Sequence, residues 1–365
     1  MTTYVEDIAT KFAGARQVKA IAPLGNGNIN QTFLVTLTGA TAEYFVLQQI
    51  NTLVFPDPIK VMDNLQLVSS HISQKLNQDS LDDWQIPQVL LTSDQKHHYL
   101  AEDNTFWRAI SYVANADSQD TITNLEQATE IGRGLGVFHR LVSDLSLDKL
   151  VDTLPGFHIT PGYLAQYQQV LEHKVIPNLA TAQFCQQFIQ KRTTIVDILE
   201  QAKATKVLPL RPIHGDPKVN NIMLDCQSQK AIAMVDLDTV KPGLIHYDIG
   251  DCLRSGCNKL GEEAQNWRDV EFDLKLAEQI LQGYLNIMRA IISDQEKNYI
   301  YDAVRLIAFE LGLRFFTDYL QGNMYFKTTY PEQNLNRALV QFQLTQSIEN
   351  QESAIKKLLA CSYPK

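Results

Sequence analysis

HGDPKVNN, residues 214–221, is the stretch that decides how this chain folds. It places Asp216 and Asn221 in an H-x-D-x-x-x-x-N arrangement, and a later stretch, VDLD, contributes Asp236. Two apolar pieces, NIMLD and AIAMVDLD, flank the polar CQSQK, a pattern that predicts a β-hairpin with acidic residues at its ends. The sequence therefore predicts a polar loop followed by a hairpin, and these two elements carry the chemistry.

The residue types in this stretch suit phosphoryl transfer. An acceptor hydroxyl needs a positioned carboxylate, while Mg²⁺ on nucleotide phosphates needs hard oxygen ligands from nearby elements. Asp216 suits the first role, and Asn221 and Asp236 suit the second. Because such a transfer requires mainly positioning and charge neutralisation, no covalent nucleophile is needed. The alternative is an ordinary turn, since Asp, Pro, Gly and Asn are common turn residues.

The first third of the chain is rich in short β-strand patterns. We expect strands at 32–37, 44–50 and 106–113, separated by turn signals. One helix, 58–76, interrupts them, because apolar residues recur there at helical spacing behind FPDP. A polar, turn-rich segment at 114–124 then predicts a boundary.

The remainder is predicted to be mostly helical, with the hairpin as the exception. An apolar period near 3.6 begins at Leu125, and long amphipathic helices are expected at 184–204, 271–292, 294–321 and 334–359. The sequence thus predicts an α+β protein with a β-rich N-terminal lobe at 1–113, a hinge at 114–124 and a helical C-terminal lobe at 125–365.

Composition excludes several classes of protein. With 45% hydrophobic and 20% charged residues, the chain has the composition of a folded globular protein rather than a disordered one. A net charge of −9 without a basic stripe argues against a nucleic-acid partner. Neither a membrane span nor a signal peptide is recognisable, and the five cysteines are scattered, so we expect a cytoplasmic protein with free thiols.

HGDPKVNN, VDLDTV and GLIHYDIGDCLR resemble the catalytic loop, metal-binding segment and following helix of the aminoglycoside phosphotransferase and choline kinase-like family. That family has the protein-kinase-like bilobal fold. The resemblance implies that Asp216 is the catalytic base and that Asn221 and Asp236 bind Mg²⁺, with ATP as co-substrate. His214 and Asp248 would support the loop from inside.

Three other stretches resemble one branch of that family, the N-acetylhexosamine 1-kinases. They are GNGNINQTFLV, FVLQQINTLVFPDPIKVMDNL and LRFFTDYLQGNMYFK. The resemblance implies phosphorylation of the anomeric hydroxyl of N-acetylglucosamine or N-acetylgalactosamine, with Arg314 and Tyr325 facing the sugar. Another hexose, an aminoglycoside, choline or homoserine are the rival acceptors, since related scaffolds serve all of them.

The nucleotide is expected at two places in the N-terminal lobe. GNGNIN precedes a strand, so Gly25, Gly27 and Thr32 could cover phosphates, although a hairpin turn without a ligand would look similar. Backbone groups from Ser111 to Val113 would pair with adenine. ATP and GTP both remain candidates, and the oligomeric state stays open.

The chain also departs from the family pattern. Where relatives commonly carry GHIND, this chain has GNINQ, so Asn28 and Gln31 replace a histidine and an aspartate, and Asn28 becomes the candidate sugar contact. Gln48 or Gln49 occupies the place where kinase-like folds have a phosphate-binding lysine. These departures suggest a different class of function, a nucleotide-binding pseudokinase that serves as a scaffold. The presence of Asp216, Asn221 and Asp236 argues against that class.

Overall fold

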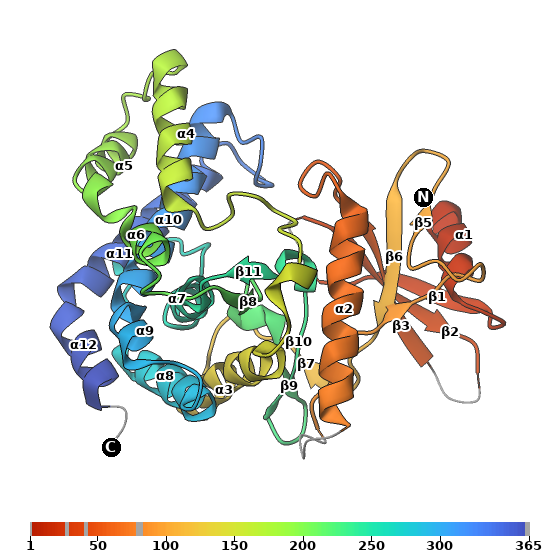
Figure 1. The fold of residues 1–365 in the computed structure, drawn as a ribbon. Coiled ribbons are helices and arrows are strands. Elements are labelled where there is room, and N and C mark those ends of the chain that lie inside the picture. The colour runs from red at the N-terminus through yellow and green to blue at the C-terminus, as the bar shows by residue number, and fades with distance from the viewer. Residues whose placement is uncertain (1, 26–28, 40–42, 78–82, 362–365) are drawn as a thin grey trace. The chain divides into compact units, whose positions relative to one another are not determined.

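The computed structural model describes residues 2–25, 29–39, 43–77 and 83–361. Contacts divide the chain into a smaller and a larger unit (Figure 1). The smaller unit comprises Met1–Ala116, Leu145–Pro155 and Val235–Lys241, and the larger comprises Asp117–Asp144, Gly156–Met234 and Pro242–Lys365. A small antiparallel sheet in the first and a mostly helical second unit confirm the predicted α+β, protein-kinase-like fold.

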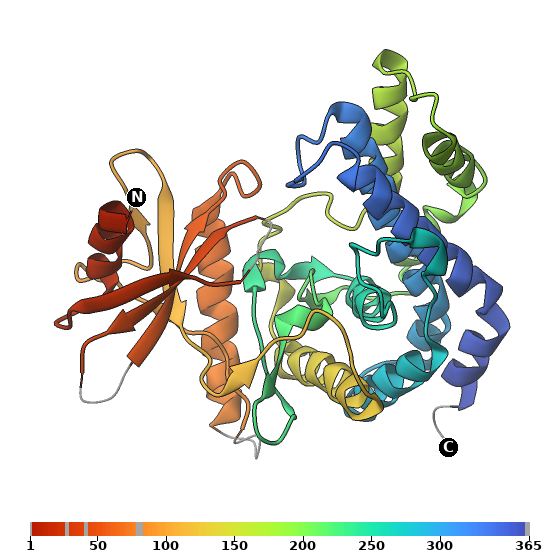
Figure 2. The same ribbon diagram turned by 180° about the vertical axis from the view of Figure 1, so that it is seen from behind.

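The smaller unit is built on one antiparallel sheet. Its strand order is β1-β2-β3-β6-β4, with β5 also paired to β6: β1 (Val18–Pro23), β2 (Gln31–Leu37), β3 (Glu43–Ile50), β4 (Val89–Leu90), β5 (Tyr99–Leu100) and β6 (Phe106–Ser111). Apolar side chains of β2, β3 and β6 form one core with helix α1 (Thr2–Phe12). Helix α2 (Pro58–Leu76) lies on the other side of the sheet (Figure 2).

Helix α2 has the bounds that the sequence predicts, because local chemistry sets its start. The Asp57 side chain accepts a hydrogen bond from the Lys60 backbone N–H, and Pro58 occupies the first helical turn. On its buried face, Asn64 donates from Nδ2 to the carbonyls of Val151 (2.7 Å) and Val240 (2.9 Å). One buried amide thus ties two later segments of the chain into the smaller unit.

The larger unit contains the hairpin and most of the helices. The predicted hairpin is β9 (Ile222–Asp225) and β10 (Ala231–Met234), which pair antiparallel. The helices are α3 (Leu125–Val142), α4 (Thr160–His173), α5 (Ala180–Gln190), α6 (Ile198–Ala204), α7 (Ile245–Gly256), α8 (Leu274–Met288), α9 (Asp294–Asn298), α10 (Ile300–Gln321), α11 (Gln333–Asn350) and α12 (Glu352–Cys361).

Short elements complete the chain. They are β7 (Ala116–Asp117), η1 (Leu147–Lys149), η2 (Thr193–Ile195), β8 (Arg211–Ile213), η3 (Val219–Asn221), η4 (Leu237–Thr239), β11 (Lys241–Gly243) and η5 (Trp267–Asp269).

Helices α3 and α8 pack with their backbones in close contact. A Cβ at Gly132 would collide with the Ile280 carbonyl, and a Cβ at Gly283 would collide with the Thr129 carbonyl. These two glycines let the helix backbones touch.

Three of the long predicted helices are interrupted. The chain leaves α5 near Arg192, whose guanidinium binds Glu349 (Nη2–Oε2 2.6 Å) and the Phe188 carbonyl (3.2 Å). A second interruption separates α11 from α12 at Gln351, which donates to the Phe272 carbonyl (2.9 Å). The third lies between α9 and α10 at Tyr299. Long-range contacts therefore set the first two boundaries.

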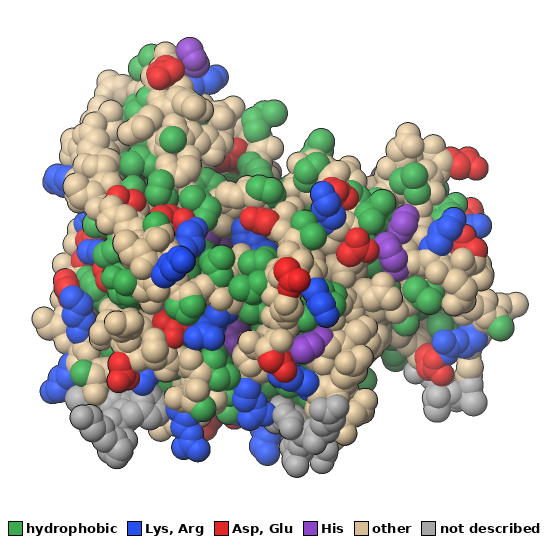
Figure 3. Space-filling model, viewed as in Figure 1, with side chains coloured by type: hydrophobic (Ala, Val, Ile, Leu, Met, Phe, Trp, Pro, Cys, Tyr) green, Lys and Arg blue, Asp and Glu red, His purple; other side chains and the backbone are tan. Residues whose placement is uncertain are grey.

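The surface carries mixed charge. On the face drawn in Figure 3, Lys and Arg side chains are interspersed with Asp and Glu. Across the ranges that the structure describes, no helix combines the length and the apolar character needed to cross a membrane.

Candidate active site

The loop HGDPKVNN lies in the larger unit, between β8 and β9. Gly215 has φ +88°, a left-handed conformation that glycine adopts without strain. Asp248, in the first turn of α7, accepts hydrogen bonds from the backbone N–H groups of His214 (Oδ2, 2.6 Å) and Gly215 (Oδ1, 2.9 Å). The carboxylate of Asp248 thus clamps the start of the loop.

Asp248 is itself held by a buried histidine. His139 Nε2 lies 2.8 Å from Asp248 Oδ2, and its Nδ1 lies 2.9 Å from the Tyr284 hydroxyl. Burial would raise the pKa of Asp248, but the hydrogen bond and charge of His139, together with His214, hold this pKa below its usual range. Asp248 therefore stays ionised inside the protein, where it serves the loop as an acceptor.

Asp216 lies at the exposed end of the same loop. Its carbonyl and Oδ2 both accept from Asn221 Nδ2 (2.7 and 3.3 Å), and Lys218 Nζ lies 3.0 Å from Oδ2. Burial opposes ionisation, but Lys218, His214 and Arg254 hold the pKa of Asp216 below its usual range. With a side chain 28% exposed, Asp216 is an ionised carboxylate that a second molecule can reach.

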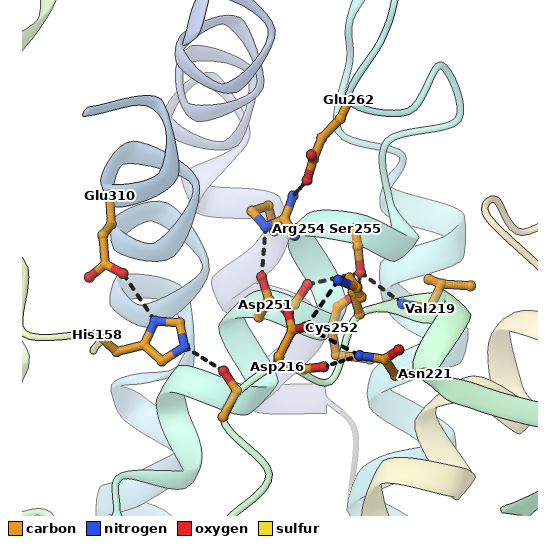
Figure 4. Close-up of polar contacts among 12 residues, drawn as sticks. His158, Asp216, Val219, Asn221, Asp251, Cys252, Arg254, Ser255, Glu262 and Glu310 are labelled. Atoms are coloured by element: carbon orange, nitrogen blue, oxygen red, sulfur yellow. Dashed lines mark hydrogen bonds and ion pairs between the residues drawn. The ribbon is translucent and has the colours of Figure 1, made fainter. Parts of the chain in front are cut away.

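A second carboxyl group, Asp251 on α7, faces Asp216 (Figure 4). Its Oδ1 accepts from Arg254 Nε (2.8 Å), while its buried Oδ2 has no hydrogen-bond partner among the residues described. Burial and the nearby charge of Asp216 raise the pKa of Asp251, although Arg254 opposes this shift. The pKa values of the two carboxyl groups are therefore shifted in opposite directions, downward for Asp216 and upward for Asp251.

Asn221 has an atom suited to a hard cation. Both of its hydrogen bonds to Asp216 use Nδ2, so the carbonyl Oδ1 is the atom available to Mg²⁺. Asp236 belongs to the smaller unit, and its backbone adopts a left-handed conformation with φ 63° and ψ 55°. Among the described residues, no group of three or more His, Cys, Asp or Glu could hold a metal alone. The Asn221 carbonyl oxygen and the Asp236 carboxylate are the hard oxygen donors that Mg²⁺ prefers.

His158 is a residue that the sequence analysis missed. It is 5% exposed and has φ 66°. Its Nε2 lies 2.7 Å from the Gly215 carbonyl, which can only accept, so Nε2 carries a proton. Its Nδ1 lies 3.0 Å from Oε1 of Glu310 on α10 (Figure 4). Burial would lower the pKa of His158, but the charge of Glu310 and the other contacts raise it, which favours a buried ion pair.

Arg314 lies one turn after Glu310 on α10, inside what we term the aromatic cage: Phe157, Tyr163, Tyr325 and Phe326. The ring centroids lie 5.1, 4.9, 5.8 and 5.4 Å from the guanidinium carbon. Such geometry stabilises a cation over the ring faces. The structure thus brings the two predicted sugar contacts, Arg314 and Tyr325, together.

Asp318 builds one wall of the aromatic cage. Its carboxylate accepts the backbone N–H groups of Met324 (2.8 Å), Tyr325 (2.8 Å) and Phe326 (2.9 Å), just after α10 ends at Gly322. Burial opposes charge on Arg314, but Tyr163, Tyr325, Glu310 and Asp216 raise its pKa. Arg314 therefore stays charged within the electrostatic range of Asp216.

The predicted nucleotide contacts lie in the smaller unit. Thr32 Oγ1 accepts from Gln48 Nε2 (3.1 Å), and Gly25 has φ +69°, where an added Cβ would meet no atom of the described residues within 4 Å. Ser111 is engaged with Gln88, to whose carbonyl its N–H donates (2.8 Å), so this N–H is already used. Val113 is buried. The predicted contacts Gly27 and Asn28 lie outside the described residues.

Comparison with known proteins agrees with this architecture. The sequence pattern of the phosphotransferase enzyme family matches residues 20–290. An aminoglycoside phosphotransferase from Alicyclobacillus acidocaldarius is similar in structure, with a TM-score of 0.63, 14% sequence identity and 96% of each chain covered. A choline kinase from Cryptosporidium parvum has a TM-score of 0.63, 12% identity and complete coverage of both chains.

A spectinomycin phosphotransferase, solved in complex with ADP and spectinomycin, also shares the fold. Its TM-score is 0.53 at 10% identity, and the match covers 99% of this chain and 97% of the other. At such low identity, these similarities establish the fold, while the family follows from the sequence match.

Proposed function

The chain belongs to the phosphotransferase enzyme family, and on that premise we propose that it is an ATP-dependent kinase that phosphorylates the anomeric 1-hydroxyl of an N-acetylhexosamine. N-Acetylglucosamine and N-acetylgalactosamine are the candidate acceptors. The products would be the sugar 1-phosphate and ADP. The proposed location is the cytoplasm.

Asp216 orients the acceptor hydroxyl and takes its proton as the phosphoryl group arrives. Its lowered pKa makes it a weak base. Weak basicity suits a loose transition state, in which the hydroxyl needs alignment more than early deprotonation. The clamp from Asp248 to the loop and the Asn221 amide fix this carboxylate before substrate binds.

Asn221 and Asp236 are the residues that would hold Mg²⁺. When bound, the ion supplies charge neutralisation to the β- and γ-phosphates. Gly25 and Gly27 would cover these phosphates, and Thr32 would lie in the same nucleotide site. Adenine would pair with backbone groups between Ser111 and Val113 other than the Ser111 N–H, which already donates to the Gln88 carbonyl, and residues 114–124 would act as the hinge. The ADP complex of the spectinomycin phosphotransferase supports a nucleotide substrate.

One observation carries the choice of acceptor: the chain's own Arg314 fills the aromatic cage. Four aromatic rings around a cation form a typical site for a quaternary ammonium group. Because Arg314 already supplies the cation and stays charged, a cationic acceptor such as choline or an aminoglycoside would be repelled. Neutral sugar oxygens, above all an acetamido carbonyl, would instead accept hydrogen bonds from Arg314, with Tyr325 close to it in the same cage. Asn28 is a further sugar contact in this proposal.

A panel of acceptors tests this proposal. N-Acetylglucosamine, N-acetylgalactosamine, glucose, galactose, homoserine, choline and kanamycin are compared by ADP release, and ³¹P NMR identifies the phosphorylated position. We expect turnover on the N-acetylhexosamines at C1. Higher kcat/KM for choline or kanamycin would contradict the proposal.

Asp216→Asn separates an enzyme from a pseudokinase. The variant keeps the size and the hydrogen bonds of the loop but loses the base, so we expect kcat to fall by about 10² or more. ADP binding, measured by calorimetry, should persist. Undiminished ADP release by this variant would remove Asp216 from the mechanism.

A further inference from the structure

Gln48 lies on β3, at or next to the position where kinase-like folds have a phosphate-binding lysine. It belongs to a row of polar side chains that runs across the sheet. In the registers of β2, β3 and β6, Gln48 lies opposite both Thr32 and Arg108. Directly opposed side chains share one face of a sheet. Gln48 donates from Nε2 to Thr32 Oγ1 (3.1 Å) and accepts at Oε1 from Arg108 Nε (2.9 Å). The amide therefore orients the neighbouring guanidinium.

Arg108 ends this row in a buried ion pair. Its Nη2 lies 2.5 Å from Asp238 Oδ1, and the two side chains are 2% and 3% exposed. The contact is an ion pair more than a directed hydrogen bond, since Oδ1 has no partner of good angular geometry. Asn30 also donates to Asp238 Oδ2 (2.8 Å). Arg108 Nη1 is buried and has no hydrogen-bond partner in the described part of the chain.

Asp238 belongs to the turn that presents Asp236. Asp236 is the N-cap residue of the turn η4, and its left-handed backbone conformation is uncommon for a residue with a side chain. Such a conformation persists when its surroundings hold it. Thr153 Oγ1 donates to the Asp238 carbonyl (2.8 Å), and Arg108 and Asn30 hold its carboxylate. Without Arg108, a charge would be buried without its counter-ion, which is strongly destabilising.

We propose that Arg108 is a positioning residue that places a positive charge beside β3, where the lysine is missing, and that, through Asp238, it fixes the turn that begins after Asp236, the proposed Mg²⁺ ligand. Arg108 supplies this charge from β6, the strand next to β3, and the Gln48 amide orients its guanidinium. This inference rests on the proposed phosphotransferase function. It predicts that Arg108 acts on the metal-dependent part of nucleotide binding and not on the binding of the sugar.

The test measures ADP binding by calorimetry, once with Mg²⁺ and once in EDTA. For Arg108→Gln we expect the affinity for MgADP to fall about tenfold or more, in the range found for residues that support metal ligands. Affinity for metal-free ADP should change less than about twofold. Arg108→Lys keeps the charge but not the forked geometry, so an intermediate loss is expected.

Asp238→Asn and the double variant test the route through Asp238. Because the two side chains act as one unit, the double variant should lose no more MgADP affinity than either single variant. Arg211→Gln is the matched control, since it breaks a comparable ion pair with the buried Glu296 (3.0 Å) in the larger unit. This control should lower thermal stability without altering the Mg²⁺ dependence.

Two failures are distinguishable. If the wild type binds ADP equally well with and without Mg²⁺, the proposed function itself fails. If the wild type shows Mg²⁺ dependence and folded Arg108→Gln or Arg108→Lys keeps it in full, the positioning role fails. Additive losses in the double variant would likewise show that Arg108 does not act through Asp238.

Discussion

Replacing His158 by asparagine should disturb the catalytic loop more than the small change in side-chain volume suggests. The amide nitrogen of asparagine lies near the position of Nδ1, so the contact to Glu310 can persist, while the Gly215 carbonyl loses its donor. A buried carbonyl left unsatisfied costs about 1–3 kcal/mol of unfolding free energy. Because Gly215 precedes Asp216, a displacement of about 1 Å could also reduce kcat about 10²-fold.

His158→Gln gives the opposite pattern, because the longer amide reaches the position of Nε2. It should keep the bond to Gly215 and most of kcat, but it removes the charged partner of Glu310, whose carboxylate keeps the hydrogen bond from Thr160 (2.7 Å). Breaking a buried ion pair by removing one member costs about 3–5 kcal/mol. Comparing kcat with the free energy of unfolding therefore separates the two contacts of one imidazole.

The pH dependence has a defined sign. The folded-state pKa of His158 is raised above about 6.5 by Glu310, with a further contribution from Asp251. Its contribution to stability is therefore fully present below about pH 6.5 and is lost as pH rises through the folded pKa. The difference in unfolding free energy between wild type and His158→Ala should shrink at alkaline pH.

Urea denaturation between pH 5.5 and 9 and steady-state kinetics are the assays. His246→Asn is the control, since its Nε2 also contacts a buried carbonyl, that of Glu296 (2.7 Å), away from the loop. Burial lowers the pKa of His246 to about 4, so its pH trend has the opposite sign. If His158→Asn and His246→Asn reduce kcat equally, or if the pH trends coincide, the role assigned to His158 is refuted.

Three further changes have specific expected outcomes. Gly283→Ala should lower the free energy of unfolding by about 1–3 kcal/mol through collision with the Thr129 carbonyl, and a variant as stable as wild type in urea would contradict the close contact of α3 with α8. Asp248→Asn should reduce kcat about 10²-fold, because the amide replaces one of the two accepting oxygens by an NH₂ donor, and unchanged kinetics would show that the clamp is dispensable. Asp236→Ala should make ADP affinity independent of Mg²⁺ in calorimetry, and a retained Mg²⁺ dependence would exclude it as a ligand.

Local signals predicted those parts of the fold that local chemistry determines. FPDP gave the start of α2 correctly, since an N-cap and a proline act within one turn. The hairpin β9–β10 was equally predictable, because its apolar pieces and polar turn are adjacent in sequence. The helix breaks near Arg192 and Gln351 were not, because each depends on a side chain that bonds to a distant segment.

The residues of the candidate site also divide into those that a local motif predicts and those that depend on contacts distant in the sequence. Asp216 and Asn221 are separated by four residues and form a recognisable motif, and the structure joins them by hydrogen bonds. His158 and Arg108 carry no motif, and their partners Glu310 and Asp238 lie more than 100 residues further along the chain. Among the residues that the sequence analysis missed, Asp251 had a usable signal, because it lies in HYDIGD, the same short motif as the predicted loop support Asp248.

The buried amide of Asn64 has a consequence for how this protein can be produced and how it forms. Its carbonyl partners, Val151 and Val240, come from two later stretches of polypeptide. A fragment ending at residue 116 would expose this amide and lack the strip of chain that carries Asp236. During synthesis, the smaller unit can be completed only after residue 241 has left the ribosome, when roughly half of the larger unit is already available to fold.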